Sequence, residues 1–325
     1  MKAVIAKEPG GAEQLTYAEQ NEPTVAPGEM LIEVHATAMN RTDILNREGK
    51  IGYAENPIIG VEVAGVVINP NGHDQFTVGE RVMGLVNGGA YAEKVAMPVD
   101  RAMSIPAELS FEQAAAIPEV FLTAYQTLYW IGKLQKGETV LIHAGGSGVG
   151  TAAIQLAKTL SDARVIVTAG SEEKLAVCKE LGADVAINYK TQSFEEEVLQ
   201  ATDQKGADVI LDFVGANYWQ KNYRSIAIDG RWVLIGVLGG SKVESISLME
   251  LMAKRIQLTG TLLTPRSDQY KAELSDDFLK KTSDYFENKS IKPIVDQVFP
   301  IEEVADAHRH MEANKNIGKI ILKVR

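Results

Sequence analysis

An alternation of short apolar strands and helical segments between residues 139 and 240 sets narrow limits on the fold of this chain. The segments typical of strands are TVLIHAG, ARVIVTAG, VAINY, ADVILDFVG and WVLIGVLGG, and those typical of helices are VGTAAIQLAKTL, EEKLAVCKELG and SFEEEVLQAT. Strands and helices that alternate at this spacing predict βαβ units and a parallel sheet. The strands are almost continuously apolar, which indicates that helices cover both faces. We therefore expect an α/β fold with a doubly wound parallel sheet.

The segments on either side of this region read differently. Residues 1–110 are mostly short strand-like runs and turns, with one early helix in RTDILNREG. A helical stretch, FEQAAAIPEVFLTAYQTLYWIG, is interrupted at Pro118, and the chain ends in a helix and the strand-like run GKIILKV. We expect a parallel-sheet domain at 122–265, inserted into a β-rich domain made from residues 1–121 and 266–325.

Composition excludes several classes of protein. The net charge of −10 argues against nucleic acid as a partner, because phosphate backbones select basic surfaces. The only cysteine, Cys178, excludes a disulfide framework and a multi-cysteine metal site. Four apolar residues between Lys2 and Lys7 are too few for a signal peptide, and no apolar run approaches the ~20 residues of a membrane helix. These features predict a cytoplasmic protein that binds no membrane.

The stretch HAGGSGVG, residues 143–150, lies between a predicted strand and a predicted helix. Glycines at such a place allow a tight turn, and the free N–H groups of the following helix favour a pyrophosphate. The pattern departs from G-x-G-x-x-G because Ser147 stands where the second glycine is expected. With the βαβ series around it, the turn predicts a dinucleotide site in which Ser147 adds a hydroxyl donor.

The second strand bears on which dinucleotide binds. Folds that bind NAD usually carry an acid about 20 residues beyond the turn, which accepts a hydrogen bond from the ribose 2′-hydroxyl. Here the strand ends in Gly170 and Ser171, Lys174 follows, and Tyr189 ends the next strand. The absent acid favours NADPH. Considered alone, Lys174 fits a solvated surface lysine as well as a ligand of the 2′-phosphate, since two glutamates precede it.

Eight motifs together give the chain a resemblance to a known family. They are MNRTD (39–43), GVEVAG (60–65), AAAIPEVFLTAYQTL (114–128), VLIHAGGSGVGTAAIQLAK (140–158), VTAGSEEKL (167–175), ADVILDFVG (207–215), DGRWVLIG (229–236) and NIGKIIL (316–322). Over essentially its full length the chain resembles the zinc-free quinone oxidoreductase branch of the medium-chain dehydrogenase/reductases. That resemblance implies a Rossmann domain inserted into a GroES-like catalytic domain. It also implies hydride transfer from NADPH to a small-molecule quinone, and a homodimer joined through the Rossmann sheet edge.

Zinc-containing members of the family provide a contrast. They hold their catalytic metal with a cysteine at the place of Asn40 and a histidine at the place of Val61. Neither asparagine nor valine is a strong zinc ligand. We expect no zinc, and a quinone or a conjugated carbonyl accepts hydride without a metal.

Four residues are candidates for catalysis. By resemblance, Asn40 lies near the nicotinamide and the substrate, Asp43 is tied to Arg41 or the loop, and Tyr53 and Ser147 complete the set. Asn40 and Asp43 fit equally well as a helix cap, with Asp43 at the third helical position. Further cleft candidates are Glu62 and Arg41.

Most of the cofactor-binding candidates follow predicted strands of the parallel sheet, and the others lie before its first strand or after its last one. We expect buried structural roles for His143, Asp212 and Cys178, and we expect Asp212 to lie near the cofactor cleft. Leu262 and Leu263 also fit an apolar edge strand that pairs with its twin in a dimer. The full set of expected cofactor residues is Asn40, Thr123, Gly145, Ser147, Gly148, Val149, Gly170, Ser171, Lys174, Tyr189, Val214, Gly236, Val237, Leu238, Leu262 and Leu263.

Three alternatives to the quinone reductase stay open from the sequence. One is an NADPH-dependent reductase of α,β-unsaturated aldehydes or ketones, which differs only in the substrate pocket. Another is an NADPH-binding redox sensor with little turnover. A zinc alcohol dehydrogenase is the last, and stoichiometric zinc would favour it.

Overall fold

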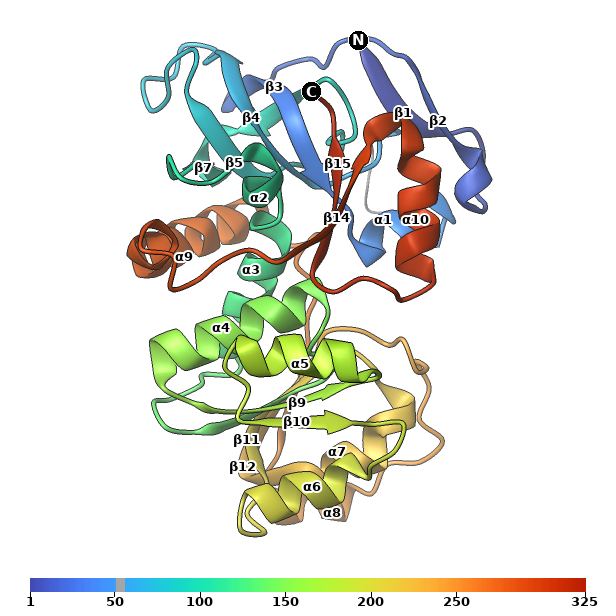
Figure 1. Ribbon diagram of the computed structural model, residues 1–325, viewed down its shortest axis with the longest axis vertical. Helices are drawn as coiled ribbons and strands as arrows, with labels where there is room; N and C mark the ends of the chain where they lie inside the picture. The colour runs from blue at the N-terminus through green and yellow to red at the C-terminus, as the bar shows by residue number, and fades with distance from the viewer. Residues whose placement is uncertain (51–55) are drawn as a thin grey trace. The chain divides into compact units, whose positions relative to one another are not determined.

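The computed structural model of the protein describes residues 1–50 and 56–325, so the candidate Tyr53 lies outside the described residues. Its internal contacts divide the chain into two units (Figure 1). One unit comprises Met1–Leu122 and Leu263–Arg325, and the other comprises Thr123–Leu262. The boundaries expected from the sequence, after residues 121 and 265, lie one and three residues from these.

The central unit contains a six-stranded sheet in which every neighbouring pair of strands is parallel, so the predicted parallel sheet is confirmed. The strand order is β10-β9-β8-β11-β12-β13. The first strand in sequence, β8, therefore lies in the middle, and the order changes direction between β8 and β11. The strands are β8 (Thr139–Ile142), β9 (Arg164–Ala169), β10 (Val185–Asn188), β11 (Ala207–Asp212), β12 (Ile226–Leu234) and β13 (Gln257–Gly260).

Helices cover both faces of this sheet, as the apolar strands predict. In Figure 1, α4 and α5 lie on one side of the strands, and α6, α7 and α8 lie on the other. Between the sheet and α6, a core of apolar side chains includes Leu141, Ile210, Phe194 and Trp232. The helices are α4 (Gly148–Ser161), α5 (Glu172–Glu180), α6 (Phe194–Ala201), α7 (Trp219–Ser225) and α8 (Leu248–Lys254), preceded by a π-helical segment, Gln126–Ile131.

The β-rich unit is built from both ends of the chain. The last strand, β15, pairs antiparallel with β3, with Ile321 opposite Ala38. The larger sheet has the order β14-β15-β3-β4-β5-β7, with β6 also on β3, and β1 and β2 form a separate pair. The strands are β1 (Lys2–Ala6), β2 (Leu15–Glu19), β3 (Glu29–Ala38), β4 (Glu62–Asn69), β5 (Arg81–Leu85), β6 (Lys94–Pro98), β7 (Ala102–Ser104), β14 (Val295–Pro300) and β15 (Lys319–Lys323).

The helices of the β-rich unit follow the predicted pattern closely. The early helix is α1 (Arg41–Arg47), and the predicted break at Pro118 separates α2 (Phe111–Ala115) from α3 (Pro118–Tyr125). Proline at the first position of α3 suits a helix start, because its missing N–H would have no partner there. Two more helices, α9 (Asp268–Glu287) and α10 (Val304–Glu312), come from the C-terminal part of the chain.

The apolar segment near residue 262 is not the edge strand. The strand β13 ends at Gly260, and its four residues are all exposed, so the interpretation of Leu262 and Leu263 as part of the strand is wrong.

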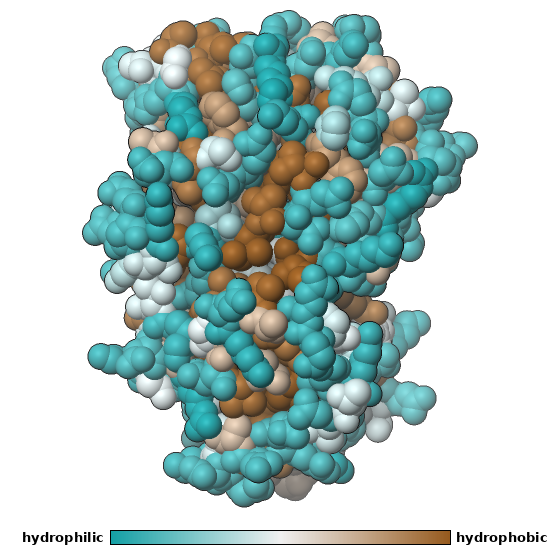
Figure 2. All heavy atoms as spheres, in the orientation of Figure 1, coloured by the Kyte–Doolittle hydropathy of each residue, from teal (hydrophilic) through white to brown (hydrophobic). Residues whose placement is uncertain are grey.

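Figure 2 shows hydrophilic residues over most of the face in view. Most of the exposed large apolar side chains fall between residues 237 and 262. Among the described residues, none of the helices has the length and apolarity to span a membrane.

Candidate functional site

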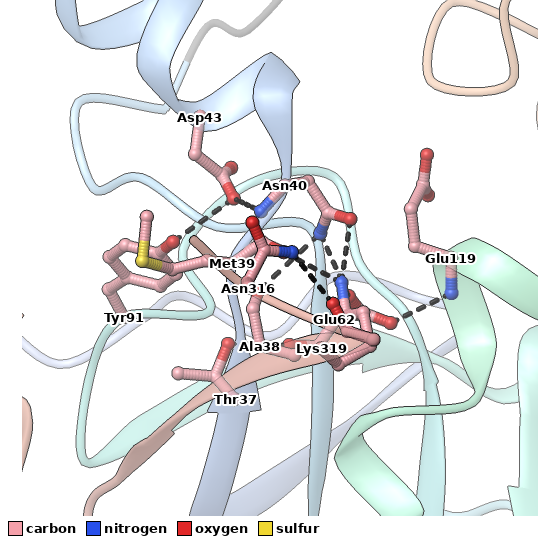
Figure 3. A network of polar contacts seen from close by, with 11 residues as sticks. Thr37, Ala38, Met39, Asn40, Asp43, Glu62, Tyr91, Glu119, Asn316 and Lys319 are labelled. Atoms are coloured by element: carbon pink, nitrogen blue, oxygen red, sulfur yellow. Dashed lines mark hydrogen bonds and ion pairs between the residues drawn. The ribbon is translucent and has the colours of Figure 1, made fainter. Parts of the chain in front are cut away.

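A buried ammonium group organises one cluster of polar residues in the β-rich unit (Figure 3). Lys319 Nζ donates to the Met39 carbonyl at 2.7 Å, to Asn40 Oδ1 at 2.8 Å and to Glu62 Oε1 at 2.8 Å. Lys319 begins β15 and Glu62 begins β4, and Met39 and Asn40 directly follow β3, which pairs with both of these strands. An ammonium has three hydrogens, so every donor of Lys319 has a partner within this cluster.

The Asn40 side chain is held on both sides. Its Oδ1 accepts from Lys319, and its Nδ2 donates to Glu62 Oε1 at 2.8 Å. The amide therefore has one orientation, with the nitrogen toward the carboxylate and the oxygen toward the ammonium. Asn40 is buried, with 8% of its surface exposed, so the predicted residue occupies a rigid position at the end of β3.

The second oxygen of Glu62 connects the cluster to a helix. Glu62 Oε2 accepts from the backbone N–H of Glu119 at 2.8 Å, in the first turn of α3. The free N–H groups of a helix start favour a carboxylate there. The Glu119 side chain is itself buried, and burial followed by repulsion from Glu62 raises the pKa of its carboxyl to about 8.

Asp43 forms the other branch of the cluster. Its Oδ2 accepts from the Asn40 backbone N–H at 2.7 Å and from the Tyr91 hydroxyl at 3.0 Å. The first of these bonds is the acidic half of a capping box, so the capping interpretation of Asp43 is confirmed. The predicted tie to Arg41 is wrong, because that guanidinium donates instead to the Met311 carbonyl and to Asn314 Oδ1. Burial raises the pKa of Asp43 to about 7.

The cluster does not fit a zinc ion. At the two places where zinc-containing members carry ligands, Asn40 is bonded to an ammonium and Val61 is a buried apolar residue. The single cysteine, Cys178, belongs to the other unit. Within residues 1–50 and 56–325, no three histidine, cysteine or acidic side chains gather as a metal site would need.

The glycine turn of the central unit leads directly into α4. Ser147 is the N-cap of that helix, and its Oγ accepts from the Gly150 N–H at 3.0 Å. The Thr151 N–H bonds to the Ser147 carbonyl at 2.9 Å. Gly148 and Val149 are the first two residues of α4, so their N–H groups have no carbonyl of a preceding helical turn to bond and could serve an anion. The Ser147 hydroxyl hydrogen is also available to donate.

Crowding explains why three positions of this turn are glycine. A Cβ on Gly150 would lie 2.4 Å from the Ala144 carbonyl oxygen, and one on Gly145 would lie 3.0 Å from Cys178 Sγ. A Cβ on Gly146 would lie 3.1 Å from carbons of the Lys174 side chain. The turn is therefore packed closely against α4, β9 and α5, as a pyrophosphate-binding turn requires.

The end of β9 is bordered by the hydroxyl of Tyr189 and by the Lys190 side chain. The Tyr189 hydroxyl lies 2.7 Å from where a Cβ on Gly170 would be, so its ring lies over the strand end. Ser171 caps α5 by accepting from the Lys174 N–H. The nearby Glu172 carboxylate turns to Asn188, from which it accepts at 2.8 Å. These features fit a ribose that carries a 2′-phosphate.

Four of the remaining predicted cofactor residues follow the carboxyl ends of β11 and β12. Val214 follows β11, and Gly236, Val237 and Leu238 follow β12, where the Leu238 N–H donates to the Phe213 carbonyl at 3.1 Å. Thr123 and Leu263 are buried, whereas 54% of Leu262 is exposed.

Sequence reasoning missed Lys319, Tyr91, Glu119 and Lys190. Lys190 Cε lies 3.2 Å from the position of a Cβ on Gly170, beside Tyr189. Lys319 does carry a signal, because a lysine at the first position of the apolar run KIIL is a charged residue in a buried strand. The tyrosine and the glutamate stand in segments that give no such signal.

Comparisons with known proteins agree with this architecture. Residues 26–107 match the family model described as the alcohol dehydrogenase GroES-like domain, and residues 148–279 match the model described as zinc-binding dehydrogenase. The chain is 32% identical over 317 residues to quinone oxidoreductase-like protein 2 of Bos taurus, covering 96% of this chain and 89% of the relative.

Two solved structures have closely similar folds. A structure described as an NAD-dependent alcohol dehydrogenase is 32% identical, with a TM-score of 0.89 and full coverage of both chains. A mycobacterial protein solved in complex with NADPH is 29% identical, with a TM-score of 0.89 and full coverage of both chains.

Proposed function

This chain belongs to the medium-chain dehydrogenase/reductase family of oxidoreductases, and we propose that it transfers a hydride from NADPH to a small-molecule quinone without a metal. The observation that carries the choice of cofactor is the end of β9. The strand ends without an acid at Gly170, beside which lie Tyr189 and Lys190, while Ser171 caps α5 and the Lys174 side chain lies against Gly146 of the glycine turn. A 2′-phosphate gains hydrogen bonds and charge from such a border. The similar mycobacterial structure holds NADPH.

The residues of the central unit would hold the cofactor by its two charged parts. The N–H groups of Gly148 and Val149, with the Ser147 hydroxyl, would bind the pyrophosphate. Ser171, Lys174 and Tyr189 would bind the 2′-phosphate. The nicotinamide supplies the hydride when NADPH is bound, and the protein positions it.

In the β-rich unit, Asn40 and Asp43 are the proposed catalytic residues. Asn40 is held by Lys319 and Glu62, so it presents a fixed amide. Asp43, with a pKa of about 7, exchanges a proton near neutral pH and hydrogen-bonds to Tyr91. The Lys319 ammonium is paired with Glu62 and has its three hydrogens bonded within the cluster, so it orients the Asn40 amide and does not replace the charge of a metal at the substrate. This supports chemistry on an acceptor that is already activated.

We also propose that the protein is a cytoplasmic homodimer that binds neither nucleic acid nor membranes. All residues of the edge strand β13 are exposed, including the apolar Leu258, and the exposed apolar residues Leu238 and Met249 precede the strand in the chain. An uncovered edge of this kind is a template for pairing with a second copy. Sedimentation of the wild type and of Leu258→Lys would test this, and a monomeric wild type would contradict it.

The activity test is NADPH and NADH oxidation with 9,10-phenanthrenequinone in the presence of EDTA. We expect quinone-dependent oxidation that favours NADPH, and a loss of that preference in Lys174→Ala. The control is Lys179→Ala, which removes an exposed lysine from the other end of α5. Equal rates with both nucleotides in the wild type would contradict the NADPH assignment.

Three further outcomes separate the alternatives. Turnover of an α,β-unsaturated ketone but not of the quinone would favour the enone reductase. Tight NADPH binding without turnover of either acceptor would favour the redox sensor. Loss of alcohol oxidation on EDTA treatment, with stoichiometric zinc, would favour the alcohol dehydrogenase.

A further inference from the structure

The carboxylate of Asp212, at the end of β11, accepts four hydrogen bonds although the residue is fully buried. Its Oδ1 accepts from the backbone N–H groups of Val214 at 2.7 Å and Gly215 at 3.0 Å. Its Oδ2 accepts from Asn222 Nδ2 at 3.0 Å and Trp232 Nε1 at 3.1 Å. One oxygen therefore shapes the loop after β11, and the other is anchored to α7 and β12.

The anchor continues to the first two strands of the sheet. Asn222 uses its Nδ2 for Asp212, so its Oδ1 faces His143 Nε2 at 2.7 Å. An amide oxygen only accepts, so Nε2 carries the hydrogen. Burial lowers the pKa of His143, so the ring is neutral and its Nδ1 accepts from the Thr168 hydroxyl at 2.9 Å.

The Asp212 main chain holds a second loop. Its carbonyl oxygen accepts from the N–H groups of Ile235 at 2.7 Å and Gly236 at 3.2 Å, just after β12. The two loops also bond to each other, since the Gly239 N–H donates to the Val214 carbonyl at 2.8 Å. Asp212 is thus the common support of the loops after β11 and β12.

The strand order indicates which part of a dinucleotide these loops meet. In a doubly wound sheet the ligand crosses the carboxyl ends of the strands at the point where the order reverses, here between β8 and β11. The ends of β8 and β9 carry the glycine turn and the 2′-phosphate border. The loops after β11 and β12, on the other side of that point, therefore face the nicotinamide half.

We propose that Asp212 is a positioning residue for the nicotinamide half of the cofactor, acting through the Val214–Gly215 loop and Gly236. This inference rests on the proposed function, because it takes NADPH as the ligand. The four-donor site requires a carboxylate. An asparagine amide would place its own N–H groups against either the backbone donors or those of Asn222 and Trp232.

The test compares the binding of NADPH with that of 2′,5′-ADP, which lacks the nicotinamide half, by titration calorimetry. For Asp212→Asn we expect roughly tenfold or weaker NADPH binding and unchanged 2′,5′-ADP binding, since buried donors lose their partners. The control is Asp208→Asn, the same change on the same strand, where Asp208 accepts from the Thr139 N–H at the opposite end. It should leave both affinities unchanged.

A second variant keeps the test decisive if Asp212→Asn does not fold. Asn222→Leu removes the link to His143 but leaves the backbone bonds of Asp212, so a smaller loss confined to NADPH is expected. Equal losses for the two ligands, or no loss, would overturn the positioning role while leaving the proposed cofactor intact. A wild type that binds neither ligand would overturn the proposed function and this inference with it.

Discussion

Lys319 Nζ and Glu62 Oε1 lie 2.8 Å apart in the β-rich unit, and no more than 4% of either side chain is exposed. Charges buried in this way are costly unless each has partners. The ammonium has three acceptors, and the carboxylate accepts from the ammonium, the Asn40 amide and the Glu119 N–H. The pair therefore holds the Asn40 amide at the end of β3 and the start of α3 in fixed positions.

Removal of the ammonium should destabilise the protein strongly. Lys319→Met leaves a buried carboxylate without its counter-ion, and we expect the free energy of unfolding to fall by about 3–5 kcal/mol. The control is Lys323→Met on the same strand, whose ammonium is half exposed beside Glu112. It should change stability by less than about 1 kcal/mol. Urea denaturation of the three proteins gives the comparison, and equal losses would contradict the role of burial.

The Glu119 carboxyl should make the wild type less stable as pH rises. Its pKa is raised from 4.5 to about 8 on folding, so the folded state binds the proton more tightly. Its contribution is complete below about pH 4.5 and is lost as pH rises through about 8, on the order of a few kcal/mol. Glu119→Gln should reduce this dependence to the part that Asp43, whose pKa is also raised, contributes, as measured by denaturation between pH 5 and 8.

A neighbouring glutamate provides the control for that experiment. Glu112 has a lowered pKa, because backbone, Ser110 and Lys323 hydrogen bonds outweigh its partial burial. It is already ionised in both states across pH 5 to 8, so Glu112→Gln should leave the slope of the wild type unchanged. A Glu119→Gln slope that matches the wild type would refute the pKa assignment.

Addition of a methyl group to Gly150 should open the glycine turn. The new Cβ would lie 2.4 Å from one carbonyl oxygen and 2.6 Å from another, both on the rigid backbone of the turn. We expect Gly150→Ala to weaken NADPH binding by roughly tenfold or more, which equals about 1.4 kcal/mol. Gly260→Ala, at the end of β13 with no atom within 4 Å of its Cβ, should bind normally. Fluorescence titration with NADPH measures both, and unchanged binding by Gly150→Ala would count against the turn as the pyrophosphate site.

The Ser147 hydroxyl should have two separable effects. As the N-cap of α4 it contributes about 1 kcal/mol of stability, which Ser147→Ala removes. Ser267→Ala removes the equivalent cap of α9, whose hydroxyl accepts from the Tyr270 N–H. Thermal unfolding should show similar losses in the two variants, but only Ser147→Ala should weaken NADPH binding. If the two variants bind NADPH equally, Ser147 is a cap and no more.

The features predicted well are those encoded by neighbouring residues. The βαβ series, the break at Pro118 and the glycine turn each depend on a short stretch of chain, and each stands where the sequence placed it. The edge strand shows the limit of such reasoning. Leu262 and Leu263 are apolar enough for a strand, yet pairing with β12 ends at Gly260, and pairing depends on the neighbouring strand.

The parallel sheet and its glycine turn follow from local sequence, because apolar periodicity and glycine conformation act over a few residues. The partners of the buried charges, in contrast, depend on how distant strands pair. Lys319 is separated from Glu62 by 257 residues, and they meet because β15 pairs with β3 and β3 with β4. Asp43, expected to bond to Arg41 or the loop, likewise accepts from Tyr91, 48 residues away. A lysine or an aspartate carries no mark of its distant partner, since that partner is selected when strands pair and exclude water.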